Sequence, residues 1–302
     1  MSTGAAITRA SLALVLAAAV PASAQQLISA ADLAGFPNPP PDHRIRYGDA
    51  DLQFGNLRLP GGPGPHPVVV FIHGGCWLSA FDVAHVAQTE EAIAEAGYAV
   101  WSLEYRRVGD EGGGWPETYL DVGRGVDHLR ALAGPHALDL GRVVAAGHSA
   151  GGTFALWAAA RGKIAAGSAL HVDDPLPIHA VVALAPAGDL EGVQARGSCG
   201  RVVDRVMGGS PAEHPDRYAA ASPMRLAPIG VPQTLLIGAL DSAWGPPGRA
   251  YYHHAITAGD RAVRVVELPE SGHFEMIAPT TTSWPLVLEA LRAAFAELGA
   301  RR

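Results

Sequence analysis

The chain has 302 residues, of which 48% are hydrophobic and 17% charged, and it carries a formal net charge of −7. This composition is typical of a globular protein with a sizeable core, and it excludes a disordered or fibrous chain. The acidic balance, together with the absence of a basic tract (Lys163 is the only lysine), argues against nucleic acid or an anionic membrane surface as a partner.

The N-terminus has the pattern of a secretory signal peptide. Arg9 precedes an apolar run at residues 10–20, and an Ala-x-Ala sequence then ends at Ala24. The run is too short to span a bilayer as a helix. We therefore predict a signal peptide at residues 1–24, cleavage before Gln25, and a protein that is periplasmic or secreted and has no membrane anchor. The alternative is an N-terminal helix that packs on the domain.

Short apolar runs alternate with stretches of helical periodicity along the rest of the chain. Strands are predicted at residues 43–47, 53–59, 68–72, 98–103, 143–146, 180–184, 233–237 and 262–268, and helices at 83–96, 119–132, 150–160, 249–258 and 284–298. Unbroken apolar strands that alternate with helices indicate an α/β fold with a mainly parallel sheet covered on both faces. We expect the first two strands to form an antiparallel start.

The pattern predicts one domain, residues 25–302, without an internal repeat or a linker that would divide it. A long irregular interval at residues 185–232 follows the sixth predicted strand. We expect this interval to carry two short helices and to form a small cap over the C-terminal edge of the sheet.

The chain contains two cysteines, Cys76 and Cys199, and their spacing does not suggest a metal site. Disulfides persist outside the cytosol, so export makes a bridge between them worth considering. The sequence leaves two arrangements open, a Cys76–Cys199 disulfide or two separate thiols.

One short motif points to nucleophilic chemistry, namely Gly147-His148-Ser149-Ala150-Gly151. In a chain with 36 glycines a bare G-x-S-x-G match carries little weight, and a structural glycine-rich turn is the alternative. Its setting between a predicted strand and a predicted helix makes it meaningful, because such a turn displays the serine hydroxyl at the C-terminal edge of a sheet. We therefore identify Ser149 as the candidate nucleophile.

A serine needs a base to remove its proton and a carboxylate to orient that base. Among 13 histidines, His273 follows the last predicted strand, which places it at the same edge as Ser149. Asp241 ends the preceding strand region, and Asp189 is the alternative acid. The resulting order of serine, Asp241 and His273 is the order expected for this kind of fold.

Peptide N–H groups must also receive the negative charge that develops on the substrate's carbonyl oxygen. We expect one donor from Ala150 and another from the loop at residues 73–77, which reads HGGCW. Trp77 is a candidate wall of the substrate pocket, although an anchoring role in the core fits an aromatic residue equally well. His148 is a second candidate for the pocket, but we expect it to point away from the nucleophile.

Four stretches resemble the α/β-hydrolase superfamily, and more narrowly its esterase and arylformamidase branch with an H-G-G-x-[WF] oxyanion loop. They are HGGCW at 73–77, GHSAGG at 147–152, ALD at 239–241 and SGHF at 271–274. The resemblance implies an α/β-hydrolase fold and a Ser149, Asp241, His273 triad. It also implies an oxyanion hole formed by the backbone N–H groups of Gly75, Cys76 and Ala150. Many relatives have a third glycine at the position of Cys76, and we expect the side chain here either to narrow the acyl pocket or to add a thiol beside it.

The expected function is therefore that of an exported serine hydrolase that cleaves small-molecule carboxylic esters or activated amides through an acyl-enzyme. This chemistry needs no metal and no organic cofactor. Two alternatives stay open: an arylformamidase that hydrolyses N-formylkynurenine, and a non-catalytic α/β-hydrolase-fold binding module. The acyl preference and the oligomeric state do not follow from the sequence.

Overall fold

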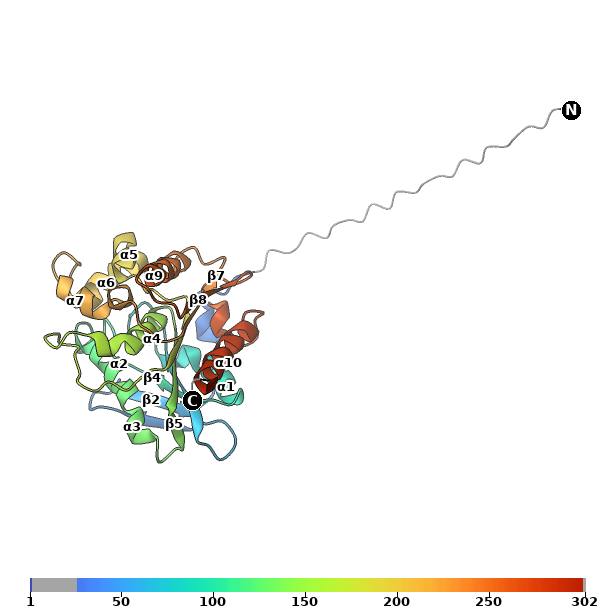
Figure 1. Ribbon diagram of the computed structural model, residues 1–302, viewed down its shortest axis with the longest axis horizontal. Coiled ribbons are helices and arrows are strands. Elements are labelled where there is room, and N and C mark those ends of the chain that lie inside the picture. Colours follow the sequence, from blue (N-terminus) through green and yellow to red (C-terminus); the bar gives the residue numbers. More distant parts are fainter. Residues whose placement is uncertain (2–25, 301–302) are drawn as a thin grey trace.

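The computed structural model describes Met1 and residues 26–300 (Figure 1). Apart from Met1, the predicted signal peptide therefore lies outside the described residues. Within these residues, eight strands form one sheet in the order β1-β2-β4-β3-β5-β6-β7-β8. The described helices include none that is both long enough and apolar enough to cross a membrane.

The first two strands run antiparallel and the others parallel, as predicted. The strands are β1 (His43–Arg46), β2 (Phe54–Arg58), β3 (His66–Ile72), β4 (Ala99–Leu103), β5 (Leu138–His148), β6 (Ala180–Leu184), β7 (Gln233–Gly238) and β8 (Val263–Leu268). β2 pairs antiparallel with β1 and β4, whereas the neighbours from β4 to β8 pair in parallel. The central strands are unbroken apolar runs because side chains on both of their faces are buried, as in β6, which reads AVVAL.

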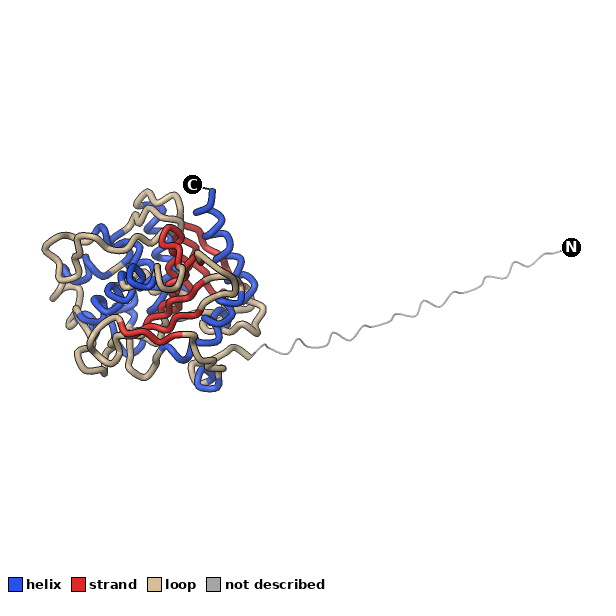
Figure 2. The backbone as a smooth tube through the Cα atoms, turned by 90° about the horizontal axis from the view of Figure 1, so that it is seen from below, coloured by secondary structure: helices blue, strands red, loops and turns tan. Residues whose placement is uncertain are grey.

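Helices cover both faces of the sheet, as Figures 1 and 2 show. One layer contains α2 (Glu117–Asp127), α3 (Leu129–Leu132), α4 (Ala150–Ala160) and α9 (Gly245–Thr257), and the other contains α1 (Ala87–Glu95) and α10 (Trp284–Ala300). The short 3-10 turns of the described residues are η1 (Asp32–Gly35), η2 (Val83–Val86), η3 (Arg161–Lys163) and η4 (Glu275–Ile277). Helix α4 is buried along nearly its whole length, because it packs between the sheet and the cap. The expected α/β-hydrolase architecture is confirmed.

The cap at residues 185–232 follows β6, but it contains four short helices where two were expected. They are α5 (Leu190–Arg196), α6 (Ser198–Met207), α7 (Pro215–Ala221) and α8 (Pro223–Leu226). Left-handed glycines end the first two helices, Gly197 at φ 66° and Gly208 at φ 73°. Prolines at the first helical position begin the last two. In Figure 1 the first three cap helices lie together on the side of the sheet that α4 and α9 cover.

Candidate active site

The candidate catalytic residues follow the carboxyl ends of four strands. The loop after β3 begins at His73, Ser149 follows β5 directly, Asp241 lies just beyond β7, and His273 lies in the loop after β8. Because these strands are parallel neighbours, their carboxyl ends meet at one edge of the sheet. The topology therefore brings together residues that are far apart in the sequence.

Ser149 occupies a tight turn between β5 and α4. Its backbone adopts φ 57° and ψ −119°, a conformation that costs a non-glycine residue about 1–3 kcal/mol and occurs mainly at functional sites. The two flanking glycines are required by close backbone contacts. A Cβ on Gly147 would lie 2.4 Å from the carbonyl oxygen of Gly151, and a Cβ on Gly151 would lie 1.9 Å from that of Ile72. The G-x-S-x-G pattern thus has a steric origin in this fold.

Asp241 and His273 are directly hydrogen-bonded. Nδ1 of His273 donates to Oδ2 of Asp241 over 2.7 Å, and the other carboxylate oxygen accepts the backbone N–H of Trp244 at 2.9 Å. Burial alone would raise the pKa of Asp241, but the hydrogen bonds from His273, Trp244 and Ala243 together hold this pKa below its usual value. The carboxylate is therefore ionised at neutral pH and fixes the tautomer of His273 in which Nε2 is free to accept a proton.

The alternative acid, Asp189, has a different role. Its Oδ1 accepts the backbone N–H of Gly192 at 2.9 Å, so it caps the N-terminus of α5 in the cap.

The indole ring of Trp244 stacks beside the imidazole ring of His273. Their centroids are 5.5 Å apart, and the two ring planes are nearly parallel.

The loop after β3 turns sharply beside Ser149. Gly75 has φ 106° and the next residue, Cys76, has φ 52°. A Cβ on Gly74 would lie 2.7 Å from the carbonyl oxygen of His148, so only glycine allows this approach to the nucleophile turn. In the part of the chain that the structure describes, the N–H groups of Gly75 and Cys76 donate no backbone hydrogen bond. Ala150 begins α4, and its N–H is free as in the first turn of any helix.

A buried polar cluster contacts this loop at its first residue, His73. Nε2 of His73 lies 3.0 Å from Oε1 of Glu104, and Arg107 also pairs with this carboxylate at 3.0 Å. Burial would raise the pKa of Glu104, but His73, Arg107 and the N–H of Val83 hold it below its usual value. The stretch EYRR at 104–107 is thus structural.

A pocket with a volume of about 80 Å³ opens beside the serine and the histidine. It is lined by Ala30, Leu33, Gly75, Cys76, Phe81, His85, His148, Ser149, Trp244, His273 and Phe274. Trp77 is not among these residues: it is buried in the core, edge-on to Phe154, which corrects its assignment to the pocket wall and matches the alternative of an anchoring role in the core. Ala30 and Leu33 belong to a segment that the sequence did not connect with the site.

Two further histidines in the pocket wall are neutral. Burial is the main cause that lowers the pKa of His148 well below its usual value, and the neighbouring His273 lowers it further. Its Nε2–H donates to the carbonyl oxygen of His273 at 2.8 Å, so His148 ties the turn at Ser149 to the histidine loop. Burial and the nearby His73 lower the pKa of His85 to about 4.

Glu275 is a site residue that sequence reasoning missed. It is buried, and its two oxygens accept the N–H of Gly272 at 2.8 Å and that of Ile28 at 2.6 Å. It therefore anchors both the loop that carries His273 and the N-terminal segment that carries Leu33. Its place two residues after the histidine was the available signal, but the partner at Ile28 could not be predicted. Among the described residues, no cluster of His, Cys, Asp and Glu side chains has the arrangement of a metal site.

Comparison with known proteins identifies the family and the fold. The model of the BD-FAE family matches residues 58–242, which include the loop after β3, Ser149 and Asp241. Esterase LipC from Mycobacterium tuberculosis is 25% identical over 277 residues, which cover 84% of this chain and 67% of LipC.

Two solved structures show the same fold. Esterase B from Lactobacillus rhamnosis, in its complex with a C4-C4 SN3 tributyrin phosphonate, matches with a TM-score of 0.73 and 20% identity, over 87% of this chain and 89% of that one. A bifunctional GH43-CE protein from Bacteroides eggerthii matches with a TM-score of 0.69 and 21% identity. That match covers 84% of this chain but only 37% of the Bacteroides protein. The family match spans more than half of the chain, and the chain therefore belongs to the BD-FAE family, with the α/β-hydrolase fold of esterases.

Proposed function

We propose that the protein is a serine carboxylesterase in which Ser149, His273 and Asp241 form the catalytic triad. The observation that carries the proposal is the 2.7 Å hydrogen bond between His273 and Asp241, beside a pocket that Ser149 also lines. The positive backbone φ of Ser149 and its position at the start of a buried helix further support it. Membership of the BD-FAE family and the likeness to Esterase LipC point to the same chemistry.

In the acylation step the hydroxyl oxygen of Ser149 attacks the carbonyl carbon of the ester, and Nε2 of His273 takes the hydroxyl proton. The carbonyl electron pair moves onto oxygen, which receives hydrogen bonds from the N–H groups of Cys76 and Ala150. Each such donor contributes roughly 3 kcal/mol of transition-state stabilisation. The tetrahedral intermediate then collapses, the alcohol leaves with the proton from His273, and an acyl-enzyme stays on the serine.

In the deacylation step water takes the place of the alcohol. His273 removes a proton from the water, which attacks the acyl carbon, and the proton then returns to the oxygen of Ser149 as the carboxylic acid leaves. Asp241 stabilises the imidazolium of His273 during both steps. Because His148 and His85 are neutral, they add no positive charge beside that imidazolium.

The pocket supports short acyl groups as substrates. It is confined by Leu33 and Phe81 and bordered by Cys76, and its volume of about 80 Å³ is well below the roughly 300–1,000 Å³ of drug-sized ligand sites. Esterase B, which has the same fold, was captured with a tributyrin phosphonate whose acyl chains have four carbons. We therefore expect acetyl to butyryl esters to be the preferred class.

Labelling with a fluorophosphonate probe tests the nucleophile. We expect one covalent adduct on Ser149 by peptide mass mapping, and loss of butyrate-ester hydrolysis by about 10⁴-fold or more in Ser149→Ala. Ser168→Ala, in a loop away from the pocket, is the matched control and should keep wild-type activity. A folded protein that acquires no adduct would contradict the proposal, and a higher kcat/KM on N-formylkynurenine than on butyrate esters would favour the arylformamidase alternative.

We also propose that the protein is exported. The signal-peptide pattern at residues 1–24 supports this location. The structure also contains a disulfide between Cys76 and Cys199, and disulfides form in oxidising compartments. Expression of the full chain in a bacterial host should yield a periplasmic protein whose N-terminus is Gln25 by mass spectrometry. A cytoplasmic protein that retains Met1 would contradict export without affecting the proposed chemistry.

A further inference from the structure

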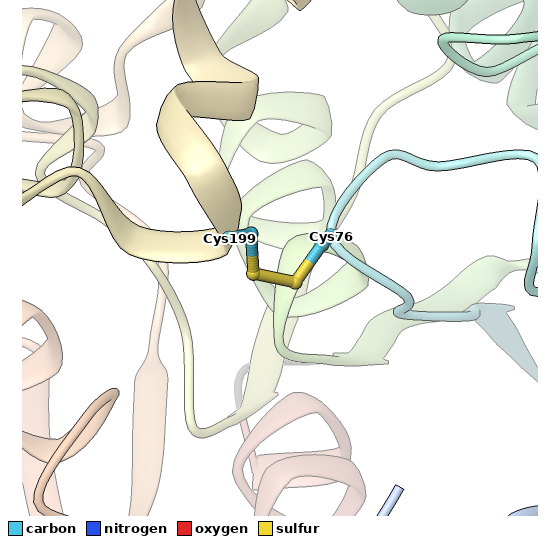
Figure 3. Close-up of a disulfide and its surroundings, with 2 residues drawn as sticks. All are labelled: Cys76 and Cys199. Atoms are coloured by element: carbon cyan, nitrogen blue, oxygen red, sulfur yellow. A yellow bond between two sulfur atoms is a disulfide. The ribbon is translucent and has the colours of Figure 1, made fainter.

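Cys76 and Cys199 are joined by a disulfide, which links the loop after β3 to the cap (Figure 3). The Cα atoms of the two residues are 6.1 Å apart, although 123 positions separate them in the chain. Cys199 lies at the start of α6, whereas Cys76 lines the pocket together with Ser149 and His273. The bond therefore ends within the wall of the candidate active site.

The backbone at Cys76 needs an external restraint. Gly74 and Gly75 precede it, and glycine offers the widest range of backbone conformations. Cys76 and Trp77 both have positive φ values, 52° and 54°, which L-residues with side chains adopt only where surrounding contacts hold them. One backbone hydrogen bond lies within the turn itself, because the carbonyl oxygen of Gly75 accepts the N–H of Leu78 at 2.9 Å. The next ones lie farther along, where the N–H of Val108 donates to Trp77 at 2.9 Å and that of Ser79 to Val108 at 3.1 Å.

The cap supplies the contacts next to this stretch. Beside the disulfide, Trp77 borders a small cavity whose other walls include Val203, Val206 and Met207 of α6. The Trp77 indole is almost fully buried, so the loop contacts α6 through an apolar interface at Trp77 and through the disulfide at Cys76. The peptide between Gly75 and Cys76 is thus restrained at its carbonyl by the turn and at the Cys76 side chain by the cap.

We propose that Cys199 is a positioning residue: its bond to Cys76 holds the Cys76 N–H where it can stabilise the oxyanion of the transition state. This inference rests on the proposed esterase function and deepens it. Because the donor acts in the transition state and not in substrate binding, loss of the bond lowers kcat and leaves KM nearly unchanged. Displacement of a catalytic donor by about 1 Å can cost a factor of up to about 100, so a decrease in kcat of about 10- to 100-fold is expected.

The test compares the oxidised wild-type enzyme with Cys199→Ala and with the double variant Cys76→Ala, Cys199→Ala. Both variants lack the bond, so both should show the same decrease in kcat. Only Cys199→Ala carries a free thiol, so an equal decrease shows that this thiol is not the cause. A trifluoromethyl ketone inhibitor, which forms a tetrahedral oxyanion adduct with the serine, should bind more weakly in proportion to kcat. Arg205→Ala, an exposed position on α6, is the matched control and should keep wild-type values.

Reduction of the folded wild type repeats the test without a mutation. Dithiothreitol supplies two electrons and two protons, closes to its own cyclic disulfide and leaves two thiols on the enzyme. The kcat should fall while the near-ultraviolet circular dichroism is retained, and Cys199→Ala should not respond. This measurement also decides the question if Cys199→Ala fails to fold.

Two results would overturn the inference. One is an active wild type in which mass spectrometry finds both cysteines as free thiols. The other is an active wild type whose kcat and inhibitor affinity stay within twofold after the bond is broken. Failure of the esterase proposal is distinguishable, because the oxidised wild type would then hydrolyse no ester and acquire no fluorophosphonate adduct.

Discussion

Oδ2 of Asp241 lies 2.7 Å from Nδ1 of His273, although the two residues are 32 positions apart and belong to loops after different strands. The close approach depends on a glycine at the end of β7. A Cβ on Gly238 would lie 2.2 Å from the carbonyl oxygen of Gly272, so a larger residue would push the histidine loop away from the aspartate. Parallel pairing of β7 with β8 places the loops that carry Asp241 and His273 next to each other.

Asp241→Asn tests the role of this hydrogen bond. The amide is nearly isosteric, but it favours the wrong tautomer of His273 and does not stabilise the imidazolium. In a serine protease the equivalent change lowers kcat by about 10⁴-fold, and we expect a decrease of about 10³- to 10⁴-fold here with little change in KM. Steady-state hydrolysis of a butyrate ester measures it.

Asp189→Asn is the matched control, because Asp189 was the alternative acid in the sequence. In the structure it caps α5, and asparagine is an equally good cap, so kcat should stay within about twofold of the wild type. A large loss of kcat in Asp189→Asn, with none in Asp241→Asn, would show that the acid has been assigned to the wrong residue.

The turn that carries Ser149 makes a prediction about stability. A methyl group on Gly151 would lie 1.9 Å from the carbonyl oxygen of Ile72 and 2.6 Å from that of His73, and backbone atoms of β3 cannot move aside cheaply. We expect Gly151→Ala to lower the free energy of unfolding by about 3 kcal/mol. Gly162→Ala, where the added methyl group meets open space, should change it by less than about 0.5 kcal/mol. Urea denaturation followed by circular dichroism distinguishes them, and equal stability of both variants would contradict the steric argument.

The fold and the candidate triad could be predicted because their signals are local. Each strand is a short apolar run, and a strand, a glycine-flanked serine and a helix follow one another within residues 143–160. Asp241 and His273 each follow a strand, so the order of parallel strands was enough to place both at one edge with Ser149. Only the pairing of Asp241 rather than Asp189 with the histidine needed the structure.

His148 and Cys76 were expected at the pocket and line it, but the wall from the N-terminal segment could not be predicted, because it depends on contacts between distant segments. The segment that carries Leu33 is tied to the site by the hydrogen bond from the N–H of Ile28 to Glu275, and no periodicity in residues 26–36 indicates that contact. The sequence could not decide between the two roles of Trp77 for a related reason. Two successive positive φ values turn its side chain into the core, and a sequence pattern does not encode that turn.

The wall formed by Leu33 makes a prediction about specificity. The side chain is 5% exposed and closes the pocket on the side of the N-terminal segment. Leu33→Ala removes three carbon atoms from this wall, so a longer acyl chain can occupy their volume. We expect the ratio of kcat/KM for octanoate to that for butyrate esters to rise about tenfold.

Ile256→Ala, at a partly exposed position on α9 remote from the pocket, is the control and should leave this ratio unchanged. If Leu33→Ala also leaves the ratio unchanged while the protein stays folded, the acyl chain does not lie against the N-terminal segment.

His85 makes a prediction about the pH dependence of stability. Its pKa in the folded state is about 4, because burial and His73 disfavour the charged form more than Asp82 and Glu104 favour it, whereas the unfolded chain has the ordinary value of 6.5. The unfolded state therefore binds more protons between these pH values. The contribution of His85 to stability is complete above pH 6.5, decreases as the pH falls and is lost by about pH 4. Between pH 7 and pH 5 this loss amounts to about 2 kcal/mol.

His85→Asn removes this titration, and the asparagine amide can still donate to the carbonyl oxygen of Asp82 that accepts Nδ1 of His85 at 2.6 Å. The variant should be less stable than the wild type at pH 7, because it loses packing, but its free energy of unfolding should fall by about 2 kcal/mol less on going to pH 5. His254→Asn, at an exposed position on α9, should keep the wild-type slope. Urea titrations at both pH values measure the slopes, and a wild-type slope in His85→Asn would mean that His85 is not held neutral by the fold.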